Sequence, residues 1–349
     1  MSSSVMIARP SVAPETGPPP GIRSVADDFV AGSAEFSQQD AGKSAATGAG
    51  PRSGRLAVLT DLWELTKPRI VMMILVTTAI AAMIAGVTSE TAAPLGWLLL
   101  GVGLVAGSAG AMNQVWEQQL DGRMVRTRRR PLPAGRLSWA AGVAFSTAIG
   151  LLGLVLLATK VGPIPMALTL ATWLVYVPIY TPLKVRSQWN TTVGAVSGAL
   201  PMLVGFTGGG GSLVDPIGWL LVGVLVAWQY PHFMAIAWLV RKEYAGAGFR
   251  MATTDDPTGR SAGWQSVVGM LFLGLCLAAL VWLLVPASPA MATLLTATVL
   301  ATTYPMTRAA WRFAGRRDDL TARRLLRASL WQLPASLSLL TFAAWYGGA

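Results

Sequence analysis

The sequence predicts an all-α, polytopic membrane protein with nine transmembrane helices. Of its 349 residues, 53% are hydrophobic and only 12% are charged, and long apolar stretches recur through most of the chain. Backbone groups in lipid must be paired internally, so stretches that can cross a bilayer fold as helices. The nine expected spans are residues 70–87, 95–112, 140–158, 164–180, 191–207, 219–239, 267–285, 290–306 and 330–346.

Residues 1–55 differ in composition from the rest of the chain. They are rich in Ser, Gly, Ala and Pro and show no sustained apolar periodicity, which predicts a disordered cytoplasmic tail before a membrane domain at 56–349. The tail has no apolar region of a secretory signal. Its acids outnumber its bases up to position 43, which is unlike a mitochondrial transit peptide.

The basic residues test the predicted topology. Every Lys and Arg except Lys160 falls in the tail or in every second loop. Because cytoplasmic loops are enriched in Lys and Arg, this places the N-terminus in the cytoplasm and the C-terminus outside a bacterial plasma (inner) membrane. The net charge of +11 is therefore an orientation signal, and we expect no nucleic-acid partner.

Two residue types occur once each. Cys276 excludes a disulfide or a cysteine metal site within one chain, and His232 excludes a haem held permanently by two histidines of the chain. His232 lies within an expected span, where a lone histidine usually faces a cavity or a partner. Contact with a substrate and packing in the core both remain open for it.

Three oxygen-bearing side chains follow the second expected span. Asn113, Glu117 and Asp121 are spaced four residues apart, so a continuous helix would place them on one face over about 12 Å. Stacked carboxylates repel each other, and a bound divalent cation would explain the arrangement. Mg²⁺ prefers oxygen ligands and is commonly held by one or two carboxylates plus substrate phosphates. The column therefore predicts half of a magnesium diphosphate site.

Six arginines come next, between positions 123 and 136, and guanidinium groups suit bidentate phosphate contacts. The positive-inside rule alone could also place several of them here. Both interpretations stay open, and the phosphate interpretation is stronger for Arg123, Arg126 and Arg130 because these three lie in the family motif described next.

These segments resemble the UbiA superfamily of intramembrane prenyltransferases, in its protohaem IX farnesyltransferase branch. The resemblance rests on the oxygen column with the RMVRTRRRPL segment at 123–132, and on TKPR at 66–69, YTPLKVR at 180–186, WQYPHF at 228–233 and RKEY at 241–244. It covers residues 56–349. One departure is Glu117, where the family usually has Asp.

The resemblance implies a central cavity open to the cytoplasmic side, in which farnesyl diphosphate and haem B, both substrates, give haem O and diphosphate. It further implies Mg²⁺ as cofactor, membrane lipid as surroundings, and a respiratory oxidase assembly or haem A synthase as partner. Asn113, Glu117 and Asp121 would hold the metal. The diphosphate candidates are Lys67, Arg123, Arg126, Arg130, Lys184 and Arg186, and the haem candidates are Tyr180, Gln229, His232 and Arg241.

Three alternatives remain. A related prenyltransferase could act on a quinone precursor or another aromatic acceptor, although the segment around His232 argues against it. A transporter would place ionisable groups near the bilayer midplane, whereas the polar motifs here gather at one end of the spans. A non-catalytic assembly factor for a respiratory complex is the third.

Overall fold

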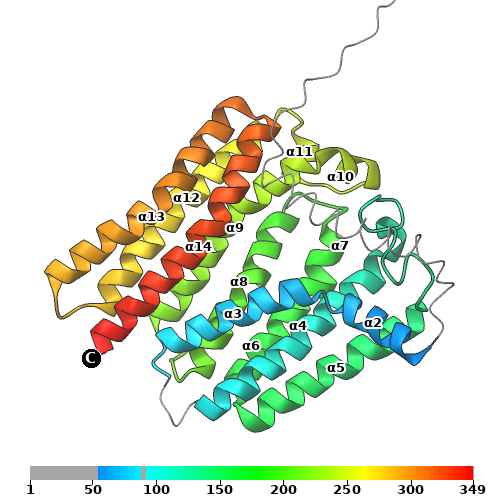
Figure 1. Cartoon of the computed structure of the whole chain (residues 1–349), viewed down its shortest axis with the longest axis horizontal. Helices are drawn as coiled ribbons and strands as arrows, with labels where there is room; N and C mark the ends of the chain where they lie inside the picture. The colour runs from blue at the N-terminus through cyan, green and yellow to red at the C-terminus, as the bar shows by residue number, and fades with distance from the viewer. Residues whose placement is uncertain (1–53, 88–91, 349) are drawn as a thin grey trace, which may run out of the picture. The chain divides into compact units, whose positions relative to one another are not determined.

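The computed structural model describes residues 54–87 and 92–348, and within them the secondary structure is helical with no strand (Figure 1). The expected tail falls almost entirely on residues 1–53, outside the described residues. The helices are α2 (Arg55–Leu65), α3 (Pro68–Ile84), α4 (Ala92–Asp121), α5 (Trp139–Lys160), α6 (Pro163–Leu174), the π-helix η1 (Val175–Tyr180), α7 (Thr181–Leu183), α8 (Asn190–Gly208), α9 (Pro216–Leu239), α10 (Arg241–Ala247), α11 (Ala252–Asp255), α12 (Arg260–Leu284), α13 (Pro289–Arg316) and α14 (Asp319–Gly348).

Polar caps and proline set several helix starts. Ser138 accepts a hydrogen bond from the Ala141 amide before α5, and Asp215 accepts one from the Ile217 amide before α9. Pro216 occupies the first position of α9, where its missing N–H costs nothing. These local signals explain why short polar loops separate long apolar helices.

Length and apolarity identify fewer membrane spans than the nine expected. Six described helical segments qualify, and the α2–α3 pair, bent by 50°, makes a seventh if it is counted as one span. Helices α13 and α14 have 28 and 30 residues, but Thr, Ser and Gln lower their hydropathy. In α13, Thr293 and Thr298 donate to carbonyls one turn back, which satisfies hydroxyls in an apolar setting. The chain is a multi-pass membrane protein, and the count of nine is not confirmed.

The helices pack as one bundle around α8 and α9. Helix α9 contacts α8, α12 and α14, while α8 also contacts α3 and α6. Helices α3 and α14, from opposite ends of the membrane domain, touch each other, and α4 pairs with α5 (Figure 1). The largest buried apolar cluster spans α8, α9, α12, α13 and α14 and includes Leu221, Met234, Leu277 and Phe313.

Two glycines of α8 allow close contact with Tyr180 and with Gln229. A Cβ at Gly194 of α8 would lie 2.7 Å from the Tyr180 ring, and one at Gly198 would lie 2.6 Å from Oε1 of Gln229. Small residues let helices approach closely in lipid. Here they make room for two polar side chains at the α8 surface.

Candidate functional site

The oxygen column lies on one continuous helix. Helix α4 runs to Asp121, and Asn113, Glu117 and Asp121 are all buried, with at most 4% of their surface exposed. None of the three points into lipid. Burial of two carboxylates requires compensation by partners, because an isolated buried charge is very costly.

Each of the three side chains contacts a basic residue from another segment. Lys67 donates to Oδ1 of Asn113 at 2.5 Å. Lys184 donates to Oε1 of Glu117 at 2.7 Å, and Arg130 donates to Oδ2 of Asp121 at 2.7 Å. Residues from four regions of the chain therefore meet at one end of α4, which the sequence spacing alone could not show.

An unusual backbone conformation positions Lys67. It lies at the bend between α2 and α3 with φ 54°, in the left-handed region that residues other than glycine rarely adopt. Such conformations cost about 1–3 kcal/mol and persist where the surroundings fix them. Across the bend, a Cβ at Gly110 would lie 3.1 Å from the Thr66 carbonyl oxygen, so α4 comes close enough for Lys67 to reach Asn113.

The π-helical turn η1 positions the opposite wall. Pro178 lies inside this turn, and Thr181 follows it and donates to the Tyr176 carbonyl at 3.0 Å. Thr181 also accepts a hydrogen bond from Nδ2 of Asn113 at 3.1 Å. Sequence reasoning missed Thr181 as a site residue, although it lies in the YTPLKVR segment and π-turns are frequent at functional sites.

Lys184 is held from several directions. Its ammonium lies 4.7 Å from the centre of the Tyr180 ring, and its backbone carbonyl accepts from the Arg250 amide at 2.8 Å. Burial alone would lower the pKa of Lys184, but the adjacent Glu117 carboxylate outweighs burial and raises that pKa. The ion pair with Glu117 therefore stabilises the charged form of Lys184.

The other predicted phosphate residues lie differently. The side chains of Arg123, Arg126 and Arg186 are exposed, and none contacts the column. Positive charge at a membrane-facing loop is sufficient to account for them. The structure thus brings together Lys67, Arg130 and Lys184 from the six candidates.

The predicted haem residues do not form one cluster. Gln229 is buried and donates to the Ala195 carbonyl on α8, whereas Nδ1 of His232 lies 2.8 Å from Oγ of Ser329 on α14. Tyr180 belongs with Lys184. Arg241 donates to Asp319 at 2.8 Å and stacks over the Trp238 ring, with its guanidinium carbon 4.3 Å from the ring centre.

His232 keeps one ring nitrogen available. Its ring stacks on Trp228 with centroids 4.5 Å apart, and its Nδ1 is engaged by Ser329. In the described part of the chain Nε2 has no hydrogen-bond partner. A ring fixed on one side with a free nitrogen on the other can donate to or ligate a substrate, and equally fits a packing role.

The side chains of the oxygen column have the ligand types of a Mg²⁺ site. Among residues 54–87 and 92–348, no cluster of three His, Cys, Asp or Glu side chains could hold a metal. Two carboxylates and an amide are nevertheless enough for Mg²⁺ that shares a substrate's phosphates and keeps waters. Within the same residues, Oε2 of Glu117 and Oδ1 of Asp121 have no hydrogen-bond partner, so each carboxylate has an oxygen to offer.

Known proteins similar to this chain point to one family. The sequence pattern of the UbiA prenyltransferase family matches residues 74–333. A protein of Rhodopirellula baltica named protoheme IX farnesyltransferase is 50% identical over 286 residues, which cover 80% of this chain and 99% of that protein. A mitochondrial protein of the same name from Arabidopsis thaliana is 34% identical over 83% of this chain and 68% of its own length.

Solved structures agree at the level of the fold. A digeranylgeranylglyceryl phosphate synthase has a TM-score of 0.64 at 14% identity, covering 82% of this chain and 98% of its own. A UbiA homolog from Archaeoglobus fulgidus, solved with GPP and Mg²⁺, has a TM-score of 0.56 at 13% identity over 80% of this chain and 99% of its own. By sequence pattern and by relatives across most of its length, the chain belongs to the UbiA prenyltransferase family.

Proposed function

We propose that this chain transfers the farnesyl group of farnesyl diphosphate to a vinyl group of haem B, with addition of one water molecule, giving haem O and diphosphate. Attack of the vinyl group on the farnesyl carbon leaves a cation next to the porphyrin ring, which water captures with loss of a proton. The relative from Rhodopirellula baltica, matched over nearly its whole length, carries the name of that activity. The observation that carries the proposal is the buried column of Asn113, Glu117 and Asp121, which meets Lys67, Lys184 and Arg130.

The arrangement suits a diphosphate leaving group. Breaking the allylic C–O bond leaves negative charge on the diphosphate, and fixed positive groups in a dry site stabilise that charge. Lys67, Lys184 and Arg130 would turn from the column to the phosphate oxygens. Asn113, Glu117 and Asp121 would then be free to hold Mg²⁺, which supplies further positive charge to the leaving group.

The allylic cation must be protected from water until the haem vinyl group attacks it. Apolar helix surfaces exclude water, and the faces of Tyr176 and Tyr180, whose ring centroids lie 5.2 Å apart, can stabilise a cation. On the acceptor side we assign His232, through its Nε2, and Gln229 to haem. Arg241 would meet a propionate after leaving Asp319.

We also propose how the protein is oriented in the membrane and which proteins receive its product. The site end of the bundle faces the cytoplasm of a bacterium and the C-terminus lies outside, because the loops at the site end carry the basic residues. The haem product would pass to a respiratory oxidase assembly or a haem A synthase.

One assay tests the reaction. The purified full-length protein is incubated with haem B, farnesyl diphosphate and Mg²⁺, and the products are separated and weighed by mass spectrometry. We expect a farnesylated haem that requires the divalent cation. Prenylation of 4-hydroxybenzoate with haem unchanged would instead assign the chain to the branch that acts on quinone precursors.

A further inference from the structure

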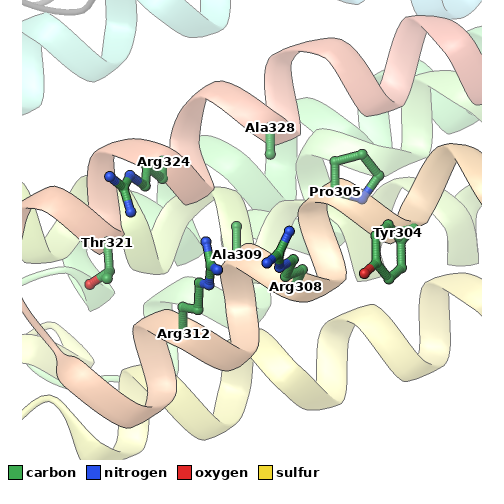
Figure 2. Close-up of a pocket in the computed structure, with 8 residues that line it drawn as sticks. All are labelled: Tyr304, Pro305, Arg308, Ala309, Arg312, Thr321, Arg324 and Ala328. Atoms are coloured by element: carbon green, nitrogen blue, oxygen red, sulfur yellow. The ribbon is translucent and has the colours of Figure 1, made fainter.

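A second concave site lies away from the oxygen column, between α13 and α14. It has a volume of about 300 Å³ and is lined by Tyr304, Pro305, Arg308, Ala309, Arg312, Thr321, Arg324 and Ala328 (Figure 2). That volume is at the lower end of the range for small-ligand sites. No residue of the site proposed for prenyl transfer lines it.

Three positive charges converge on this groove from two helices. Arg308 and Arg312 lie one turn apart on α13, and Arg324 comes from the facing α14 (Figure 2). All three are exposed, and among the residues that the structure describes none has an ion-pair or hydrogen-bond partner for its guanidinium group. Guanidinium groups held this way suit a phosphate with several oxygens.

The surroundings offer no carboxylate to neutralise the arginines. Helices α12 and α13 contain no Asp or Glu, and α14 contains only Asp319, which is paired with Arg241. Asp318, just before α14, accepts from the amide and hydroxyl of Thr321. The positive-inside rule explains why arginines are numerous here, but it does not require three of them to share one groove.

Exposed aromatic residues indicate that the groove lies near a membrane surface. Large exposed aromatic side chains surround this end of the three helices: Trp264 on α12, Tyr304 and Trp311 on α13, and Trp331 on α14. Such belts mark the lipid headgroup region. The groove also has an apolar side, formed by Pro305, Ala309 and Ala328.

We propose that the α13–α14 groove binds the headgroup of an anionic phospholipid, with the phosphate on Arg308, Arg312 and Arg324 and an acyl chain along the apolar side. Free phosphate shares the headgroup chemistry. It would gain nothing from the apolar side or from the surrounding aromatic belt, and so a lipid is the better match. This binding is independent of the proposed prenyl transfer.

The test uses the full-length protein in detergent, with dioleoylphosphatidylglycerol or dioleoylphosphatidylcholine added, and counts bound lipid by native mass spectrometry. A triple variant, Arg308→Gln, Arg312→Gln and Arg324→Gln, keeps the aliphatic stems and removes three charges. An arginine that contacts the lipid headgroup contributes about a fivefold gain in affinity, so loss of the three groove arginines should weaken binding of the anionic lipid about 100-fold.

A matched control removes three exposed arginines elsewhere: Arg128→Gln, Arg129→Gln and Arg260→Gln. It should bind phosphatidylglycerol within about twofold of the unmodified protein. Equal loss in both triple variants, or equal binding of the two lipids, would overturn the proposal. Displacement of the lipid by millimolar inorganic phosphate would identify a free-phosphate site instead. Size-exclusion elution shows whether each variant is folded, and if the triple variant is not, Arg324→Gln alone is measured with an expected loss of about fivefold.

Discussion

Substitutions in the ion pair of Lys184 and Glu117 can distinguish a structural role of the site from a role in the reaction. The two atoms in contact are 2.7 Å apart, and the side chains are 16% and 6% exposed. Removing one partner of a buried pair leaves an uncompensated charge and costs about 3–5 kcal/mol, whereas replacing both partners with apolar residues is often nearly neutral. We therefore expect Lys184→Met to lower the free energy of unfolding by about 3 kcal/mol.

The double variant Lys184→Met, Glu117→Leu should recover most of that loss and still fail to form product. Unfolding in mixed SDS micelles measures stability, and the haem farnesylation assay measures turnover in the same preparations. Recovery of stability without recovery of activity is the expected signature of a site whose charges act on a substrate. The reasoning is refuted if the double variant keeps activity within about threefold of the parent, or if Lys184→Met is as stable as the parent.

Glu64 provides a matched control. Its carboxylate accepts from Nη2 of Arg136 at 3.1 Å, and the Arg136 and Glu64 side chains are 42% and 48% exposed. Exposed pairs contribute about 0–1 kcal/mol, and Arg136 keeps its contact with Asp61. Glu64→Gln should thus change stability by less than about 1 kcal/mol and leave turnover unchanged.

Three further predictions concern single residues. Asp121→Asn should lower turnover by about 10²–10³-fold and raise the Mg²⁺ concentration needed for half-maximal rate, because a metal ligand is weakened. Lys67→Asn should keep the free energy of unfolding within about 1 kcal/mol, because Asn tolerates the left-handed backbone, while KM for farnesyl diphosphate rises. His232→Ala should raise KM for haem by about tenfold and leave KM for farnesyl diphosphate within about twofold, because it removes about 1.4 kcal/mol of haem binding.

Each of these has an outcome that counts against it. Unchanged turnover of Asp121→Asn at limiting Mg²⁺ removes the ligand role. A large loss of stability in Lys67→Asn, with unchanged substrate affinity, makes Lys67 a structural residue. For His232, Ser329→Ala is the control, because it frees Nδ1 and leaves Nε2 in place. A larger effect on farnesyl diphosphate than on haem would move His232 to the other substrate.

The helical class and the approximate positions of the helices follow from sequence alone, because bilayer thickness and backbone pairing leave few choices for long apolar stretches. The face shared by Asn113, Glu117 and Asp121 also follows, since helix α4 runs through all three. The same reasoning could not count the spans securely, because the Thr-rich α13 and the 17-residue α3 lie near the limits of apolarity and length.

The partners of the column were decided by tertiary structure. Lys67, Arg130 and Lys184 reach it, whereas Arg123, Arg126 and Arg186 remain exposed, although all six are basic residues in similar loops. The difference comes from the bend at Lys67, the π-turn before Thr181 and the packing of α8 against Tyr180. Spacing along one helix is local and can be read from order in the chain. Contact between segments separated by tens of residues depends on how the helices pack, and the packing cannot be derived from residue spacing in the sequence.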